Sequence, residues 1–409
     1  MSPQSEVERI FRQHRGRAVA AMIRFCGDID VAEEVVQDAF LIASQRWPAS
    51  GVPDAPERWI VATARRRAVD RFRRERTRGD RHDQAALVHA PPEPTEDGPV
   101  RDDRLRLIFT CCHPALSPAA SVALTLRLLG GLTTAEIAAA FLVPEATMAQ
   151  RIVRAKGKIR DARIPFRVPD DADLPDRLAA VLAVVYLVFN EGYDGHADQH
   201  LIRDDLCEEA LRLAGLVAEL MPDEPEAQGL FALLLFLVSR RPARLTERGD
   251  LVPLVEQDRR RWDGALVEQA RSVLRAALRR DRPGPYQIQA AINAVHADAA
   301  TAAETDWAQI VLLYDRLLAC TGSAVVALNR AVAVAEVDGP LVGLALLSDL
   351  VDQLDGYGSF HAVRADLLRR VGRAADAVVA YDRAVERATN GAERRFLEMR
   401  RATVARAER

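Results

Sequence analysis

Cysteines and long apolar runs are both scarce in this chain of 409 residues, and each shortage argues against a class of protein. The five cysteines form no pairing framework, which argues against a disulfide-stabilised secreted domain and fits a reducing compartment. The longest apolar runs, at 178–189 and 230–238, are too short for a bilayer core of ~30 Å. The N-terminal residues are polar and lack the apolar core of a signal peptide. We therefore expect a cytoplasmic protein.

Catalytic motifs are also missing from the sequence. It contains no glycine-rich phosphate loop, no nucleophile elbow and no pair of helical histidines with the glutamate of a metalloprotease. We therefore expect neither an enzyme nor a bound cofactor. The length predicts two or three domains. The net charge of −3 conceals alternating basic and acidic segments, which indicates that different parts of the chain contact different partners.

What the chain does contain is a dense arginine cluster in one predicted helix, at residues 59–78. Eight arginines lie on its polar faces against two acids, and such a density requires a polyanion or solvent around it. A solvated charged face is the simpler alternative, but aromatic residues bracket the arginines and a second DNA-binding pattern follows downstream. The remaining face is a narrow apolar stripe at helical spacing, made of Ile60, Ala64, Ala68 and Phe72.

The second pattern, at residues 132–160, is typical of a helix-turn-helix. Thr133 and Glu136 form a capping box, and the dipeptide 143–144 makes the turn after a helix that ends near residue 141. We expect the N-terminal turns of the next helix to enter the major groove. That helix turns Met148, Ile152 and Ile159 inward, and its outward residues are Gln150, Arg151, Arg154, Lys156, Lys158 and Arg160.

Helical patterns also dominate the two flanks of these motifs. Asp30 and Glu33 are predicted to form a capping box that opens a helix ending near residue 46, followed by a loop with two prolines and a glycine at 48–53. After residue 169, about 240 residues rich in alanine and leucine show no strand pattern. Residues 372–385 resemble a tetratricopeptide hairpin, and 207–235 and 310–334 echo it. The packing positions of that hairpin are Ala377, Ala380, Tyr381 and Ala384.

In this order, the motifs resemble those of bacterial RNA polymerase sigma factors of the compact extracytoplasmic-function (ECF) type. Residues 32–43 resemble region 2.2, the helix that docks on polymerase. Residues 59–74 resemble regions 2.3 and 2.4, which melt and read the −10 promoter element, and 132–160 resemble region 4.2, which reads the −35 element. Residues 107–118, residues 186–193 and the long C-terminal extension resemble the ECF subgroup that carries a tetratricopeptide-like domain.

Two positions depart from the family pattern. Arg66 stands where the melting helix usually has asparagine, and Leu142 stands where the turn commonly has glycine. We expect both departures to affect promoter preference and turn geometry rather than the family assignment.

The resemblance implies an all-α fold with four parts. Residues 1–80 would be the region 2 helical bundle, and 81–103 an acidic flexible linker. Residues 104–168 would be the region 4 helix-turn-helix, and 169–409 a regulatory domain of tetratricopeptide-like helical repeats.

The implied function is to bind core RNA polymerase through its β′ clamp and β flap, recognise the −35 and −10 elements and initiate transcription. A regulatory protein or ligand would act on the helical extension, and no membrane is involved. The alternative is a helix-turn-helix regulator with a ligand- or protein-sensing helical domain, although an operator-binding protein needs neither the clamp-like helix nor the arginine-rich one. An enzyme built around Glu191, His196 and His200 has weaker support.

The candidate residues fall into four groups. A flipped −10 base would lie in a pocket of the loop 47–58, above the −10 group. The −10 group is Trp59, Arg65, Arg66, Arg67, Asp70, Arg71, Arg73 and Arg74. The −35 group is Glu145, Thr147, Gln150, Arg151, Arg154 and Lys158. The polymerase group is Glu34, Gln37, Asp38 and Leu41, and contacts between the extension and the sigma core are assigned to Asn190, Glu191 and Tyr193.

Two patterns invite a metal hypothesis, and we favour the structural interpretation of both. Adjacent cysteines suit one tetrahedral site poorly, so 111–113 (Cys-Cys-His) is read as buried helical cysteines. His196 and His200 have helical spacing, but nearby glycines suggest a loop. Gly192 is predicted to be the left-handed C-cap of the apolar helix 178–189. We therefore predict no metal site.

Overall fold

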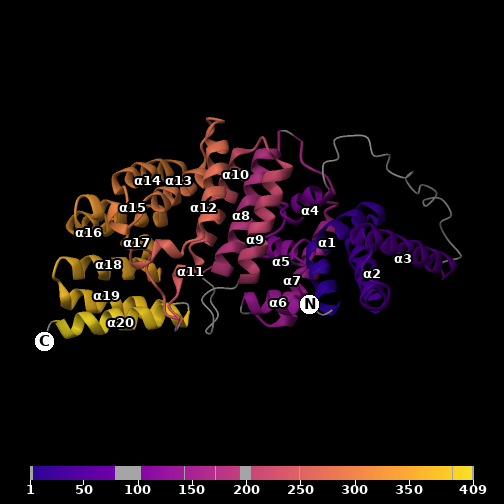
Figure 1. The fold of residues 1–409 in the computed structure, drawn as a ribbon, viewed down its shortest axis with the longest axis horizontal. Helices are drawn as coiled ribbons and strands as arrows, with labels where there is room; N and C mark the ends of the chain where they lie inside the picture. The colour runs from indigo at the N-terminus through magenta and orange to yellow at the C-terminus, as the bar shows by residue number, and fades with distance from the viewer. Residues whose placement is uncertain are drawn as a thin grey trace. The chain divides into compact units, whose positions relative to one another are not determined.

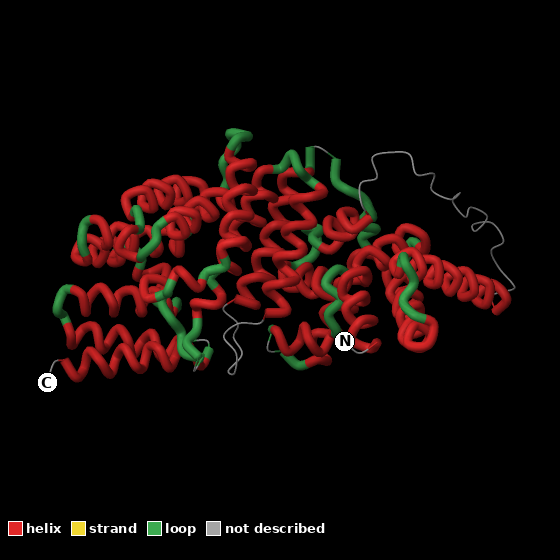
Figure 2. The backbone as a smooth tube through the Cα atoms, in the orientation of Figure 1, coloured by secondary structure: helices red, strands yellow, loops and turns green. Residues whose placement is uncertain are grey.

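The computed structural model describes the backbone of residues 3–78, 103–141, 143–170, 172–193, 204–247, 249–388 and 390–407. Within these ranges the regular elements are helices, apart from one isolated bridge between Leu245 and Leu251 (Figures 1 and 2). The predicted all-α fold is confirmed. No helix in the described ranges is long and apolar enough to cross a membrane. The chain divides into two compact units, Met1–Val184 and Val185–Arg409.

The N-terminal unit is built from two small helical groups (Figure 1). In the first group, α1 packs on α2 and α3, and α2 packs on α3. In the second, α5 and α6 pack on α7, while α4 joins the groups by contacting both α1 and α5. The helices are α1 (Pro3–Cys26), α2 (Ile29–Ser50), α3 (Pro56–Arg78), α4 (Asp103–Cys111), α5 (Pro118–Leu128), α6 (Thr134–Ala140), α7 (Glu145–Asp161) and the first half of α8 (Leu174–Tyr193).

Helix α2 differs from its prediction at both ends. The N-cap is Asp28, whose side chain accepts a hydrogen bond from Val31 N at 2.9 Å, so the predicted capping box of Asp30 and Glu33 is wrong. The helix also continues through Pro48 and ends at Gly51, which has a φ of 78° and donates its N–H to Trp47 O. A proline in the last turn removes one backbone hydrogen bond, and the packed helix tolerates the loss.

Caps define the helix-turn-helix as the sequence predicts. Ser117 caps α5 by accepting from Ala120 N, with Pro118 at the first helical position. Before α6, Thr133 N donates to Glu136 Oε2 at 2.7 Å, and Glu136 N donates to Thr133 Oγ1 at 3.1 Å. This reciprocal pair is the capping box expected from the sequence, and it is confirmed.

The C-terminal unit is a succession of helices in which most pack against their neighbours in the chain (Figure 1). Helix α9 packs on α10, α10 on α12 and α13, and α13, α14 and α15 follow in turn; α18, α19 and α20 form a last layered group. The helices after α8 are α9 (Asp204–Leu220), α10 (Pro225–Ser239), α11 (Arg241–Arg244), η1 (Leu254–Glu256), η2 (Arg259–Arg261), α12 (Gly264–Leu278), α13 (Pro285–Asp298), η3 (Ala302–Glu304), α14 (Trp307–Thr321), α15 (Ala324–Val337), α16 (Pro340–Ser348), α17 (Val351–Leu354), α18 (Gly358–Arg370), α19 (Ala374–Arg387) and α20 (Gly391–Ala407).

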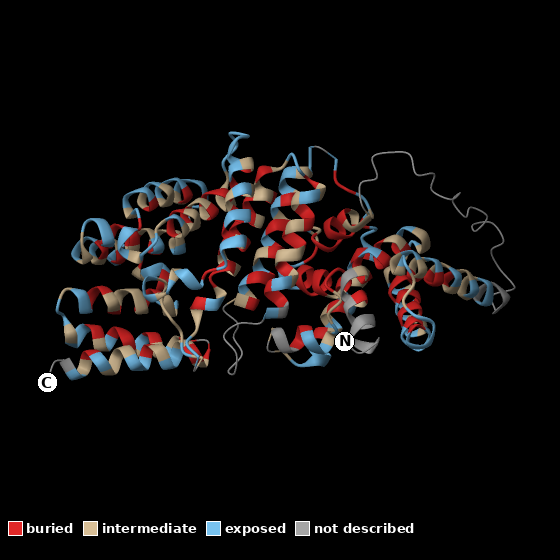
Figure 3. Cartoon of the chain, viewed as in Figure 1, coloured by how far each residue is buried: buried red, intermediate tan, exposed pale blue. Residues whose placement is uncertain are grey.

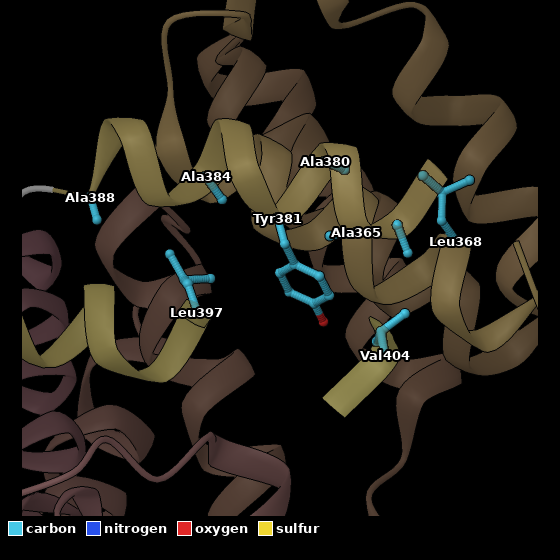
Figure 4. Packing of buried hydrophobic residues seen from close by; sticks show 9 residues of the cluster. Ala365, Leu368, Ala380, Tyr381, Ala384, Ala388, Leu397 and Val404 are labelled. Carbon is cyan, nitrogen blue, oxygen red and sulfur yellow. The ribbon is translucent and has the colours of Figure 1, made fainter. Parts of the chain in front are cut away.

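The clearest predicted hairpin, residues 372–385, covers the turn before α19 and most of α19, and this single helix packs on α18. Its turn contains Gly372 at a φ of 78°, and the four predicted packing positions on α19 are all buried (Figure 3). Figure 4 shows Tyr381 pointing from α19 toward the helix that carries Leu397 and Val404. The small alanines let the helices approach, and the tyrosine ring fills the space between them. The resemblance of this extension to tetratricopeptide repeats stays a prediction, as do the predicted domain boundaries.

Gly192 has a different role from the predicted one. Helix α8 continues through it to Tyr193, so it is not a left-handed cap. A Cβ at this position would lie 2.8 Å from the backbone nitrogen of Cys207 and 2.8 Å from Cβ of Leu206. The glycine is therefore required because α8 and α9 approach closely there.

Candidate nucleic-acid interface

The arginine-rich helix α3 has the predicted apolar stripe as its inner face. Ile60, Ala64 and Ala68 are each 0% exposed, and α3 packs on both α1 and α2. The opposite face carries four members of the predicted −10 group that are exposed to solvent (Figure 3). These four are Arg66, Asp70, Arg73 and Arg74.

The other arginines of the −10 group point toward neighbouring helices. The guanidinium of Arg65 lies over the ring of Phe25, 4.9 Å from its centroid. Arg67 Nε lies 4.0 Å from Asp38 Oδ2, and Arg71 forms an ion pair with Glu34. Because Glu34 and Asp38 belong to the predicted polymerase group, the two predicted surfaces adjoin each other and share ion pairs in this structure.

Trp59 lies at the start of α3 and packs against Trp47 of α2. The two ring centroids are 5.3 Å apart with an interplanar angle of 62°. Trp47 is 4% exposed, and residues 47–50 are helical, so the predicted −10 loop begins later than expected, at Gly51. Trp47 is a core residue, whereas Trp59 is half-buried. Whether the loop holds a flipped base stays a prediction.

The predicted polymerase group lies on the outer face of α2. Glu34 and Gln37 are exposed, Asp38 is half-buried, and the Leu41 side chain is 58% exposed. A single exposed leucine is normal on a protein surface. The assignment of this face to polymerase therefore stays a prediction.

The predicted recognition helix α7 buries Met148, Ile152, Ala155 and Ile159. These lie along one face, and the predicted −35 group occupies the remaining faces. Arg151 is half-buried, and the other five members of the group are exposed: Glu145, Thr147, Gln150, Arg154 and Lys158.

A buried charge cluster joins α7 and α5 to α1 and α2. Its centre is Glu33, which is 7% exposed. One carboxylate oxygen accepts from Arg15 Nη2 at 2.7 Å and lies 3.0 Å from Arg127 Nε, and the other lies 2.5 Å from Lys156 Nζ. Lys156 Nζ also lies 2.8 Å from Asp30 Oδ1, and Arg15 donates to the carbonyl of Arg127. The cluster therefore fastens region 4-like helices to region 2-like helices.

Burial by itself raises the pKa of Glu33. The nearby cations Lys156, Arg127 and Arg15 together lower it by more than burial raises it, so the net shift is downward and the carboxylate stays charged. Burial lowers the pKa of Lys156, and Glu33 and Asp30 reverse the shift, so its net direction is upward. Burial lowers the pKa of Arg15 despite Glu33, yet an arginine remains cationic at neutral pH. The cluster thus contains three cations around one buried anion.

Sequence reasoning missed this cluster, because it assigned Glu33 to a cap and placed Lys156 among the outward residues of α7. That placement of Lys156 is wrong for this structure, since its side chain is only 14% exposed. One signal was available: Glu33 lies three residues before the core residue Val36 and seven before Phe40, which places an acid on an apolar face.

Some of the predicted features lie outside the described residues, and the two cysteines of the Cys-Cys-His pattern belong to the core rather than to a binding site. Leu142, His196, His200 and the linker up to residue 102 are outside the described ranges. Cys111 and Cys112 are both buried, and burial raises the pKa of both thiols, as expected for inert core cysteines. Within the described ranges, no group of three histidine, cysteine, aspartate or glutamate side chains is placed to hold a metal ion.

The predicted regulatory contacts lie at the end of α8. Asn190 is exposed, and Glu191 and Tyr193 are half-buried. Tyr193 stacks on Phe189 at 5.1 Å, its ring lies 3.7 Å from the Arg244 guanidinium carbon, and its carbonyl accepts from Arg244 Nη1 at 2.6 Å. These contacts all lie within the C-terminal unit, at the end of α8 and between it and Arg244 of α11.

Three families match separate parts of the chain. Residues 10–78 match sigma-70 region 2, residues 106–159 match sigma-70 region 4, and residues 177–278 match a family of unknown function. An uncharacterized protein of Rhizobium meliloti (strain 1021) is 43% identical over 391 residues, which cover 94% of this chain and 92% of that protein.

Two further relatives have names. The probable ECF RNA polymerase sigma factor SigI of Mycobacterium tuberculosis is 32% identical over 41% of this chain and 59% of its own length. The ECF RNA polymerase sigma factor SigK of Mycobacterium sp. (strain KMS) is 29% identical over 37% of this chain and 78% of its own. Helices α2 and α3 lie in the segment that matches region 2, and α7 lies almost entirely in the later segment that matches region 4. This chain therefore belongs to the ECF type of RNA polymerase sigma factors, which bind core polymerase and promoter DNA and initiate transcription, and it carries a long helical extension.

Proposed function

We propose that three helices of this sigma factor divide its contacts in the initiation complex. The outer face of α2 binds the β′ clamp of core polymerase, the exposed arginines and Trp59 on α3 hold the −10 element, and α7 reads the −35 element. The observation that carries the proposal is the distribution of exposed residues: acids and a leucine on α2, arginines on α3, and mixed polar and basic residues on α7. Arginines follow phosphate and an aromatic face stacks on an unpaired base, which is the chemistry that promoter melting needs.

The proposed reading of the −35 element distinguishes base contacts from phosphate contacts on α7. Replacing Arg151 by alanine is expected to weaken binding to the preferred −35 sequence by ~1–3 kcal/mol and to relax preference at one base pair, because arginine pairs with guanine edges. Replacing Lys158 is expected to weaken all sequences alike and to reduce the salt slope by ~0.9. Anisotropy titrations of the polymerase holoenzyme with matched and single-base-changed promoters measure both. Equal discrimination by wild-type and Arg151→Ala holoenzymes would contradict the assignment.

We also propose that the free protein is held in a closed form that must open on polymerase. The −35 and −10 elements lie roughly 25 base pairs apart, which at ~3.4 Å each is roughly 85 Å. Helices α3 and α7 have 23 and 17 residues, and at ~1.5 Å per residue they span ~35 Å and ~25 Å. With Lys156 of α7 bonded to Glu33 and Asp30 of α2, the two reading helices cannot reach both elements together.

The close approach of Gly16 to Leu129 offers a test of the closed form. A Cβ on Gly16 would lie 2.9 Å from the carbonyl oxygen and 3.2 Å from Cα of Leu129, both backbone atoms that cannot rotate away. Gly16→Ala is therefore expected to loosen the contact between α1 and α5, to increase the radius of gyration in small-angle scattering, and to raise run-off transcript yield when the sigma factor is limiting.

The matched control for this test is Gly356→Ala, because a Cβ at Gly356 would meet no atom within 4 Å. The control is expected to leave both the scattering and the transcript yield unchanged. An unchanged radius and an unchanged yield for Gly16→Ala would refute the closed form.

The helical extension is proposed to regulate this opening through α8, which runs across the boundary between the two units. Near its start, Arg177 donates to the carbonyl of Phe109 at 2.6 Å, and at its end Tyr193 contacts Arg244. Run-off transcription by the full chain is compared with that of a chain ending after Tyr193, so that α8 is kept. Equal yields over a range of sigma concentrations would count against regulation by the extension.

A further inference from the structure

Two arginines of the C-terminal unit, the buried Arg240 and the half-buried Arg259, share one tryptophan ring. The guanidinium carbon of Arg240 lies 5.3 Å from the ring centroid of Trp262, and that of Arg259 lies 5.4 Å from the same centroid. Arg240 is the C-cap of α10 and is 6% exposed, and Trp262 is 8% exposed. Two like charges therefore contact the same ring, and the charge of Arg240 has little water to screen it.

Arg240 lacks a counter-charge among the described residues. Its Nε donates to the carbonyl of Phe236 at 3.3 Å, whereas its Nη2 is buried without any hydrogen-bond partner. Burial lowers the pKa of Arg240, and Arg244 and Arg259 lower it further, while Tyr193 and Tyr314 act in the opposite direction. The carboxylates of the described residues make no comparable contribution. A ring face attracts the guanidinium but leaves the N–H groups along its edge unsatisfied.

Arg259 is held firmly but is also incompletely satisfied. Its Nη1 donates to the carbonyls of His296 at 2.8 Å and Ala299 at 2.7 Å, and its Nη2 donates to Thr305 Oγ1 at 2.8 Å. Its Nε is buried and has no partner. These bonds fix the position of a guanidinium that donates to neutral oxygens, and the carboxylate of Glu304 acts on its charge without a hydrogen bond among those described.

Two neutral groups of the same cluster carry further unsatisfied atoms. Trp262 Nε1 and His296 Nδ1 are buried without partners, and His296 is 7% exposed. Burial, Arg240 and Arg259 lower the pKa of His296 to about 3, so its imidazole is neutral at pH 7 and cannot serve as a counter-ion. It can still donate one hydrogen bond, as the indole does.

Buried polar atoms are nearly always hydrogen-bonded in folded proteins, and buried charges are paired. Here four such atoms without partners belong to one contact cluster, and three of them are permanent donors: Arg240 Nη2, Arg259 Nε and Trp262 Nε1. A single group that both satisfies these donors and balances the charge of Arg240 is an acceptor with negative charge and several lone pairs. Carboxylates and phosphates have this chemistry and form charge-assisted hydrogen bonds with guanidinium groups.

We propose that this cluster is a binding site for a small oxyanion, in which Arg240 and Arg259 hold a carboxylate or phosphate group of a free small molecule. The burial of Arg240, Trp262 and His296 favours a small molecule over an acidic side chain of a partner protein. Arg259 and Trp262 come from the irregular segment between α11 and α12, so local displacement of that segment would admit the ligand.

The test is calorimetric titration of the full chain with inorganic phosphate and with citrate, in chloride buffers of matched ionic strength. We expect saturable binding of one anion per chain, and at least tenfold weaker binding by Arg240→Gln. The control is Arg260→Gln, because Arg260 is adjacent to Arg259 but its side chain is 89% exposed and pairs with Asp258. This control is expected to bind as the wild type does. The anion that binds with the higher affinity indicates whether the ligand carries a phosphate or a carboxylate group.

The proposal is overturned if the wild type binds neither anion saturably, or if Arg240→Gln and Arg259→Gln bind as tightly as the control. If Arg240→Gln does not fold, Arg259→Lys takes its place, because it keeps the charge and removes the guanidinium donors. The titration needs neither polymerase nor promoter, so its outcome is independent of the proposed regulation of transcription.

Discussion

Replacing Glu33 by glutamine is expected to lower the free energy of unfolding of the N-terminal unit by ~3–5 kcal/mol. Glutamine has nearly the same shape, but it leaves Arg15, Arg127 and Lys156 around a neutral group in a site that is almost closed to water. Removing one member of a buried ion cluster costs more than the cluster contributes, because the remaining charges are left uncompensated. Urea denaturation followed by circular dichroism measures the change.

Glu34→Gln is the matched control, because Glu34 is the next residue of α2 and pairs with Arg71 at the surface, where its side chain is 63% exposed. Exposed ion pairs contribute ~0–1 kcal/mol, so the control should be close to the wild type. If Glu33→Gln were no less stable than Glu34→Gln, the cluster would not hold the helices together.

The same cluster predicts an acid limit to stability. The folded-state pKa of Glu33 lies below its unfolded value of ~4.3, so its stabilising contribution is complete above that pH and is lost as the pH falls through the folded pKa. The pKa of Lys156 is raised, so its contribution is present below ~10.4 and is lost at higher pH. The charged form of the cluster is thus stable across the neutral range. As the pH is lowered from 5 through the folded-state pKa of Glu33, the Glu33→Gln variant should lose less of its free energy of unfolding than the wild type does.

A triple replacement of Arg66, Arg73 and Arg74 by glutamine is expected to weaken promoter binding by the holoenzyme about 100- to 500-fold at 0.1 M salt. Each lost phosphate contact reduces the slope of log K against log salt by ~0.7 on single strands and ~0.9 on duplex, so three reduce it by ~2–3. All three side chains are on the solvent face of α3, away from its apolar stripe. Titrations between 0.05 and 0.4 M salt measure the slope.

The control for this prediction removes the same charge from the extension, with Arg260, Arg275 and Arg279 replaced by glutamine. All three are exposed and lie in η2, α12 or just after α12. The salt slope of this control should equal that of the wild type. If both triple variants lost promoter affinity to a similar extent, net charge, and not the α3 surface, would determine that affinity.

Local patterns predicted local structure well, because the signal and the structure involve the same few residues. The stripe of Ile60, Ala64 and Ala68 is the buried face of α3, and Thr133 with Glu136 caps α6 through bonds three residues apart. Both depend only on helical periodicity and short-range hydrogen bonds.

The errors came where residues distant in the sequence determine the outcome. Glu33 was assigned to a cap because its partners lie 18, 94 and 123 positions away at Arg15, Arg127 and Lys156. Gly192 was assigned to a left-handed turn because the approach of α9, which requires the glycine, is a tertiary contact. Periodicity cannot show which helix covers a face, so Arg240 and Arg259 also gave no signal as a pair.

The charge cluster around Glu33 limits how this protein can be recombined. Its four members come from α1, α2, α5 and α7, so each half of the sigma core supplies two of them. A chimera that joins region 2 of this chain to region 4 of a relative would keep Arg15 and Glu33. The charge of Glu33 would be balanced as it is here only if the new helices carried cations at the places of Arg127 and Lys156. Regions 2 and 4 are therefore not freely interchangeable modules. Under the roles proposed for α3 and α7, promoter specificity would have to evolve on their outer faces, where substitutions leave the cluster intact.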